Sequence, residues 1–182
     1  MSRFVAFLRG MNVGGHRATS SELRSLFADA AFEGAATFRT SGNVIFDAPD
    51  GDGREDVRAR IERGLEEGLG YAVPVFLRDA AEVRAISACE PFPADAVASS
   101  KGKLQVVLLA TPPTAAARRN VLAHASDEDR LALVGRELYW LPSGGTLDSA
   151  LDLKAIAKLL GGLTTMRTKG TIDLIAAKHC SD

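Results

Sequence analysis

Hydrophobic and polar positions in the first part of the chain follow a strand-like and then a helix-like pattern. Residues 4–8 form an unbroken apolar run of the kind expected for a strand buried on both faces of a sheet. Thr19 and Glu22 then have the spacing of a capping box, which predicts the start of a helix. One face of this helix is apolar and carries Leu23, Leu26, Phe27 and Ala30.

A hairpin and a second helix are predicted next. Residues 36–41 and 44–48 have strand character and flank Gly42-Asn43, a dipeptide suited to the primed turns that join antiparallel strands. Asp52 and Glu55 form a second capping pair, after which apolar residues recur at every fourth position. These residues are Val57, Ile61, Leu65 and Leu69.

A fourth strand completes the first repeating unit. Gly70 stands where a helix C-cap glycine belongs, and residues 73–77 follow it as a strand. Pro74 marks this strand as an edge strand or as a strand start, because proline cannot donate to a ladder. The order strand, helix, strand, strand, helix, strand is that of a ferredoxin-like unit.

The rest of the chain repeats this order after an interruption. Proline, serine and glycine break the pattern over residues 89–102, which we interpret as a linker between an N-terminal unit, 1–88, and a C-terminal unit, 103–182. Thr168 precedes a terminal helix. The sequence therefore predicts an α+β fold made of two ferredoxin-like (βαββαβ) units in tandem, with a C-terminal helix.

Composition narrows the classes of protein that this fold can serve. The chain has 182 residues, of which 46% are hydrophobic and 25% charged, as in ordinary globular proteins. Its 22 basic and 23 acidic residues give a formal net charge of −1, which argues against a general nucleic-acid binder. Cys89 and Cys180 lack metal-ligand spacing, and no apolar run is long enough for a bilayer. We expect a cytoplasmic protein without a metal site.

The loop from Arg9 to Arg17 is the strongest candidate for a ligand site. Its glycines at positions 10, 14 and 15 permit positive φ and close approach of a ligand, and the following helix offers a positive dipole end. The spacing matches neither G-x-G-x-x-G nor a P-loop, so no cofactor is indicated. The alternative is a strand-to-helix connection whose glycines only satisfy backbone geometry.

Four motifs stand out in this sequence, at residues 7–16 and 40–46, at Pro91-Phe92, and at residues 165–167. Together they resemble the motifs of the DUF1697 family of uncharacterised bacterial proteins. The resemblance covers almost the whole chain and implies an α+β fold of two ferredoxin-like units, with no established activity. After Arg167 the family pattern typically continues with Asn and Trp, whereas this chain has Thr168 and Lys169. The residues that look like family signatures are Arg9, Gly10, Asn12, Gly14, Gly15, Ser41, Gly42, Asn43 and Arg167.

Our leading hypothesis is a protein that binds a small anionic metabolite or nucleotide at loop 9–17. The predicted ligand-binding residues are Arg9, Asn12, Gly14, Gly15, His16, Arg17, Ser41, Asn43 and Arg167. The alternative hypothesis is a protein-interaction or nucleic-acid-binding module without enzymatic activity. No Ser-His-Asp grouping supports a particular reaction, and the sequence indicates neither a cofactor nor an oligomeric state.

Several of these polar residues also have a structural interpretation. Asn12 and Asn43 are suited to holding turn geometry through bonds to their own backbone. Arg39 falls in a predicted strand, where its planar guanidinium offers a fork for bidentate recognition of a carboxylate or phosphate. The alternative, which we favour for Arg39, is a solvated or ion-paired side chain. We expect loop 9–17 and the 42–43 turn at opposite ends of their strands. Three interpretations of the two segments therefore remain open. They form two separate sites, or one site and one structural feature, or a site that the other unit completes.

Overall fold

The computed structural model describes residues 1–11, 15, 17–39 and 42–181, and the chain forms two compact units. The first contains Met1–Arg84 and Ile175–Asp182, and the second contains Ala85–Leu174. Each unit has a four-stranded antiparallel sheet. This architecture confirms the predicted α+β fold with two units of the same element order. The predicted boundaries at 1–88, 89–102 and 103–182 stay a prediction.

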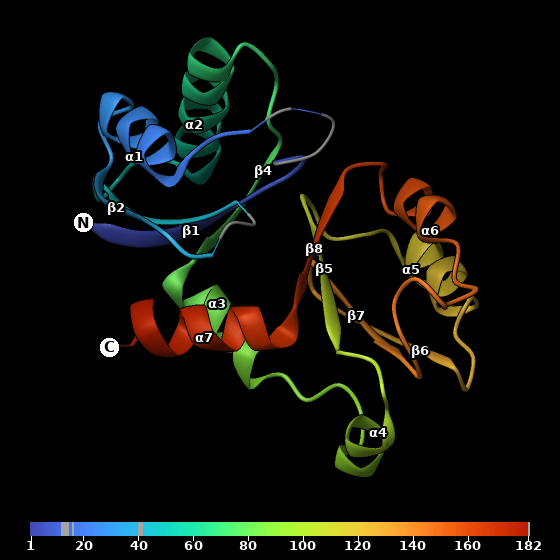
Figure 1. Cartoon of the computed structure of the whole chain (residues 1–182). Coiled ribbons are helices and arrows are strands. Elements are labelled where there is room, and N and C mark those ends of the chain that lie inside the picture. The colour runs from blue at the N-terminus through green and yellow to red at the C-terminus, as the bar shows by residue number, and fades with distance from the viewer. Residues whose placement is uncertain (12–14, 16, 40–41, 182) are drawn as a thin grey trace. The chain divides into compact units, whose positions relative to one another are not determined.

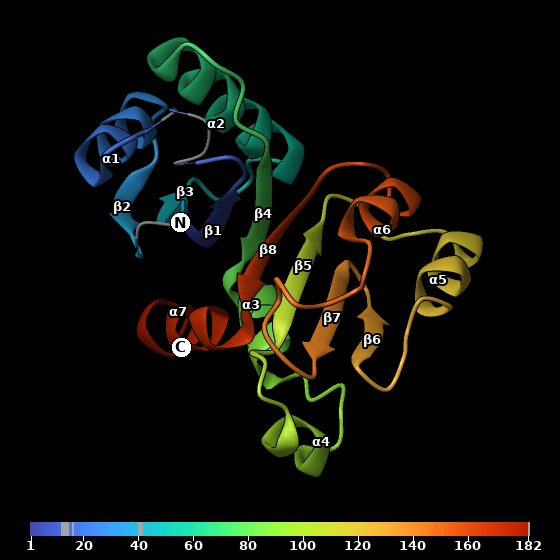
Figure 2. The same ribbon diagram turned by 45° about the vertical axis from the view of Figure 1, so that its right-hand side comes forward.

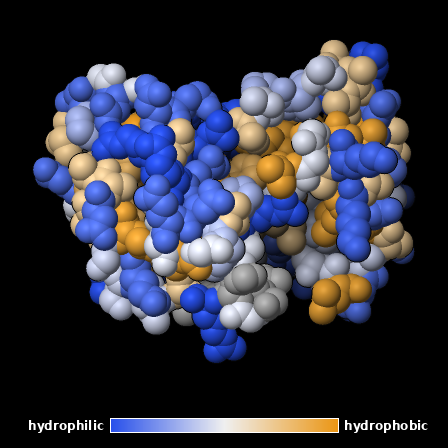
Figure 3. Space-filling model, turned by 90° about the horizontal axis from the view of Figure 1, so that it is seen from above, coloured by the Kyte–Doolittle hydropathy of each residue, from blue (hydrophilic) through white to orange (hydrophobic). Residues whose placement is uncertain are grey.

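The first unit has two helices on one face of its sheet (Figure 1). Its elements are β1 (Ser2–Leu8), α1 (Ser20–Asp29), β2 (Glu33–Thr37), β3 (Asn43–Ala48), α2 (Arg54–Leu69) and β4 (Val75–Asp79). The strands lie in the order β2-β3-β1-β4, so β4 is at an edge, as predicted from Pro74. The outer faces of α1 and α2 are mainly hydrophilic (Figure 3), as expected for helices that bury one stripe only.

The helix boundaries show which local signals act in the folded chain. Thr19 and Glu22 form the predicted capping box at the start of α1. By contrast, α2 begins after Gly53 without a side-chain cap, so the predicted capping role of Asp52 is wrong. The carboxylate of Asp52 instead accepts a hydrogen bond from Arg60 Nη1 at 2.6 Å. Asp52 thus pairs with a side chain of α2 and does not cap its backbone.

The connection between β2 and β3 is longer than the two-residue turn predicted for it. β2 ends at Thr37 and β3 begins at Asn43, which therefore lies in the strand. The predicted strand 36–41 is correct at 36–37 and wrong at 38–39, and residues 40–41 lie outside the described residues. Arg39 consequently lies outside any strand. The reason is a pair of hydrogen bonds: Phe38 N–H donates to the Asn43 carbonyl, and Asn43 Nδ2 donates to the Phe38 carbonyl, each at 2.9 Å. Asn43, at the start of β3, thereby holds the two ends of the connection together.

The second unit repeats the scheme (Figure 2). Its sheet and covering helices are β5 (Gln105–Leu109), α5 (Ala115–Leu122), β6 (Asp129–Val134), β7 (Glu137–Pro142), α6 (Leu153–Leu159) and β8 (Thr164–Thr168). The strand order β6-β7-β5-β8 matches that of the first unit. Val134 pairs with Glu137 across Gly135-Arg136, so β6 and β7 form a hairpin.

The described residues also form the helices α3 (Ala80–Ala88), α4 (Ala94–Ser99) and α7 (Lys169–His179). The short helix α4 falls within the segment interpreted as a linker. The division between the two units passes through α3, after Arg84, and through α7, after Leu174. In the part of the chain that the structure describes, no helix combines the length and the apolar character needed to cross a membrane.

An ion pair on the first sheet makes the stability of the protein depend on pH. Arg3 donates to both carboxylate oxygens of Asp47, at 2.9 and 2.8 Å. This pairing lowers the pKa of Asp47 below its usual 3.8 and raises that of Arg3. The stabilisation is therefore present above pH 3.8 and is lost as the pH falls through the folded-state pKa.

We predict that Asp47→Asn lowers the free energy of unfolding by up to about 1 kcal/mol at neutral pH, since Arg3 is partly exposed and solvent screens the pair. The difference from the natural protein should shrink in urea unfolding curves recorded below roughly pH 4. Asp127→Asn, which removes an exposed carboxylate, is the matched control. A difference that stays constant down to roughly pH 2 would contradict the role of the pair.

Candidate functional site

Two connections of the first unit leave its sheet at the same end. Phe7, near the end of β1, pairs with Asn43 at the start of β3. The Leu8 N–H also donates to the Gly42 carbonyl at 2.8 Å. Since β1 leads into loop 9–17 and the β2–β3 connection leads into β3, the two connections are neighbours.

The expectation that these connections lie at opposite ends is therefore wrong. β3 is antiparallel to both β1 and β2, so β1 and β2 run in the same direction and finish at the same end of the sheet. The local sequence of either segment contains no sign of this arrangement. It follows from the antiparallel pairing of β3 with both β1 and β2.

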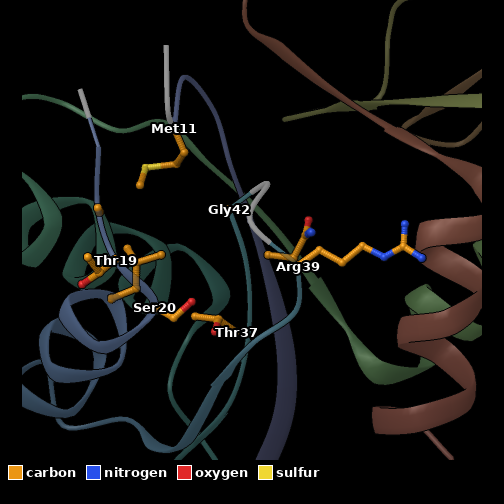
Figure 4. A pocket seen from close by; sticks show the side chains of 9 residues that line it. Met11, Thr19, Ser20, Thr37, Arg39 and Gly42 are labelled. Atoms are coloured by element: carbon orange, nitrogen blue, oxygen red, sulfur yellow. The ribbon is translucent and has the colours of Figure 1, made fainter. Parts of the chain in front are cut away.

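A cavity of about 140 Å³ lies where the two connections meet. Figure 4 shows Met11, Thr19 and Ser20 from the β1–α1 side, with Thr37 and Gly42 from the hairpin side. The described lining residues are Met11, Ala18, Thr19, Ser20, Leu23, Thr37, Arg39, Gly42 and Asn43. A water molecule takes up about 30 Å³ of liquid, so the cavity has room for a group the size of a phosphate or carboxylate.

Gly42 is required by the close approach of the two connections. It has φ +71°, and a Cβ at this position would lie 2.9 Å from Met11 Cγ and 3.1 Å from Leu8 Cβ. A side chain would therefore meet both the strained backbone region and the neighbouring loop. The absence of a side chain at Gly42 allows the two connections to approach each other beside the cavity.

The N-terminus of α1 faces the cavity, but a carboxylate of the same helix already offsets its positive dipole end. Glu22 N–H donates to Thr19 Oγ1 at 3.2 Å, and Thr19 N–H donates to Glu22 Oε2 at 2.7 Å. The backbone and hydroxyl hydrogen bonds from Thr19 lower the pKa of Glu22, so this carboxylate is ionised at neutral pH. An anion in the cavity therefore needs a positive charge from another source.

The structure places the predicted site residues in different surroundings. Asn43 is fully buried in the cavity wall, where its amide bonds to Phe38. Arg9 is half-buried and its N–H donates to the Pro74 carbonyl at 3.0 Å, whereas Arg17 is exposed. Neither arginine is among the described lining residues, and their contact with a ligand stays a prediction.

Further predicted residues are only partly covered by the structure. Gly15 has φ +87°, as expected of a glycine that serves backbone geometry. The predicted residues Asn12, Gly14, His16 and Ser41 lie outside the described residues. A ligand-binding role of these five positions stays a prediction.

Arg167 belongs to the second unit, on β8. Its Nη1 donates to Thr165 Oγ1 at 2.9 Å and to the Met166 carbonyl at 2.8 Å. Burial lowers its pKa to about 10, so the guanidinium stays charged at neutral pH. These bonds explain its orientation on the strand, and its role toward a ligand stays a prediction.

Sequence reasoning missed Thr37 and Met11 as residues of this cavity, and it considered Arg39 for anion recognition but placed it in a strand. Because the strand was predicted to continue to residue 41, the sequence did not indicate that Thr37 and Arg39 lie at and just after the end of β2. Thr19 and Ser20 carried a visible signal, since an N-cap directly after a glycine-bearing loop must face that loop. For metals, residues 1–11, 15, 17–39 and 42–181 contain no group of three His, Cys, Asp or Glu side chains suited to an ion.

These features define an α+β protein with two antiparallel sheets and a small cavity under the glycine-bearing loop of its first unit. The chain belongs to the family described as protein of unknown function (DUF1697), whose model matches residues 1–139.

A solved structure of the same fold is that of the conserved bacterial protein SP0830 from Streptococcus pneumoniae. It covers 97% of this chain and 97% of its own, with a TM-score of 0.72 and 17% sequence identity. This likeness shows the fold alone. No curated protein matches the chain.

Proposed function

We propose that the cavity between the β1–α1 loop and the β2–β3 connection binds the anionic group of a small metabolite or nucleotide. The observation that carries this proposal is the convergence of both connections on one cavity of suitable size. Ser20 and Thr37 each contribute a hydroxyl to its lining, and neither hydroxyl has a hydrogen-bond partner among the described residues. Two donors are thus available to a phosphate or carboxylate oxygen.

The size of the cavity indicates which part of such a ligand it holds. Pockets that enclose a whole ligand usually measure about 300–1,000 Å³. A cavity of about 140 Å³ takes the charged group only. The remainder of the molecule would lie outside the cavity, where Arg9 and Arg17 flank the loop.

We predict that the double variant Arg9→Ala, Arg17→Ala loses ligand binding while it stays folded, because Arg17 is exposed and Arg9 is only half-buried. The measurement is thermal melting against inorganic phosphate, phosphorylated sugars, nucleotides, dicarboxylates and short RNA. A ligand at a hundredfold excess over its Kd should stabilise the protein by about 2.7 kcal/mol, which corresponds to a rise in Tm of roughly 5–11 °C.

Arg118→Ala, Arg119→Ala on α5 is the matched control, since it removes the same charge from an exposed helix of the second unit. Unchanged affinity in the Arg9, Arg17 variant would remove loop 9–17 from the site. Absence of any shift with all anions would contradict the proposal. Binding of RNA alone, with an affinity that falls steeply with salt, would favour the alternative function as a nucleic-acid-binding module.

A further inference from the structure

Arg39 is the one cationic residue among the described residues that line the cavity. Its side chain nevertheless points away from the cavity: in Figure 4 it runs in the direction opposite to Met11 and Thr19. Arg39 thus lies in the wall of the cavity but directs its positive charge away from it.

The contact that holds Arg39 outward is a weak one. Its guanidinium carbon lies 5.8 Å from the centre of the Phe38 ring, at the far end of the range for a cation–π contact. Lys178 Nζ lies 5.8 Å from the same ring, so two cations share one aromatic group. The imidazole of His179 packs edge-on to the ring, with 5.9 Å between the ring centres. A charge-assisted hydrogen bond from guanidinium to an oxyanion is stronger than an exposed cation–π contact.

The backbone of Arg39 is also in an unfavourable state. Its φ of +57° lies in the left-handed region, which a residue with a Cβ adopts at a cost in energy. Phe38, directly before it, is anchored to Asn43 by two hydrogen bonds. The backbone strain is therefore confined to Arg39, which lies between the anchored Phe38 and the cavity. Rotation at this residue would change the direction of its side chain without moving the strands.

We propose that Arg39 is the specificity-determining residue of the cavity, and that it leaves Phe38 to place its guanidinium over a phosphate or carboxylate group when one binds. This inference rests on the proposed anion binding at the same cavity. The planar fork of arginine forms two parallel N–H···O bonds with either group, which lysine cannot do. It supplies the positive charge that the capped N-terminus of α1 does not.

The test is a titration with inorganic phosphate, followed by NMR chemical shifts, of the natural protein and of variants at residues 38 and 39. Arg39→Gln should weaken binding roughly tenfold or more, and Arg39→Lys should give an intermediate affinity. Phe38→Leu should bind phosphate roughly two- to fivefold more tightly, because Arg39 is no longer held away. Arg118→Gln, which makes the same charge change on α5, should leave the affinity unchanged.

The outcomes separate this inference from the function on which it rests. Equal phosphate affinity in the natural protein and in Arg39→Gln would overturn the role of Arg39 and leave anion binding standing. Absence of phosphate binding to the natural protein at all would overturn both.

Arg39→Asn distinguishes recognition from a structural role. Asparagine tolerates the left-handed region well, so this variant should unfold at the same or a higher urea concentration than the natural protein. Its affinity for phosphate should fall as much as that of Arg39→Gln. A parallel loss of stability and affinity would show that Arg39 only supports the fold, and would overturn the proposal.

Discussion

Replacing Phe46 with alanine should lower the free energy of unfolding by about 3–5 kcal/mol, the range found for truncation of a buried phenylalanine. Phe46 has no exposed surface and lies at the centre of an aromatic cluster on β3. Its ring centre is 4.9 Å from that of Phe32, 5.1 Å from that of Phe27 and 5.9 Å from that of Phe4. Alanine would remove contacts to rings from β1, α1 and the segment before β2 at once, and would leave a cavity between the sheet and α1.

Urea unfolding followed by far-UV circular dichroism measures this loss. Fluorescence is less direct, since the single tryptophan, Trp140, lies on β7 in the second unit. Phe46→Leu is the matched variant: it keeps most of the volume and should cost only about 1–2 kcal/mol. A loss below about 1 kcal/mol for Phe46→Ala would mean that the cluster does not form the core of the first unit.

Replacing Asn43 with aspartate should cost about 3 kcal/mol or more at pH 7, because a charge would be placed where Asn43 has no exposed surface. The amide Nδ2 donates to the Phe38 carbonyl at 2.9 Å, and an ionised carboxylate has no proton to donate there. A protonated aspartate could donate to the same carbonyl. Part of the loss should therefore be recovered as the pH falls toward roughly 4.

Substitutions at Asn43 also distinguish a structural role of its amide from a role in ligand binding. Asn43→Ala removes the hydrogen bond without adding a charge, so it should cost about 1–3 kcal/mol at every pH. Urea unfolding of both variants between roughly pH 4 and 8 is the measurement. Full stability of both variants with loss of anion binding would instead mean that the amide serves the ligand and not the connection between β2 and β3.

Local signals in the sequence were sufficient for much of the fold. The capping box of Thr19 and Glu22 and the C-cap glycine Gly70 at the end of α2 act over a few residues, and the structure confirms both. The element order of both units follows from the same signals. The prediction of the β2–β3 turn failed because Gly42-Asn43 has the composition of a two-residue turn. The side chain of Asn43 is used to close a longer connection instead.

The sequence by itself determined the fold class, the family, and the loop near which a ligand site was expected, because each rests on short-range patterns. Only the tertiary structure decided that loop 9–17 and the β2–β3 connection border one cavity, since strand order places the ends of β1 and β2 together. The same holds for Arg39. Whether its charge faces solvent, Phe38 or the cavity depends on a left-handed backbone angle and on a ring held near the last turn of α7. The angle is held by the hydrogen bonds between Phe38 and Asn43, and the ring position by packing against His179, and neither can be read from the sequence around Arg39.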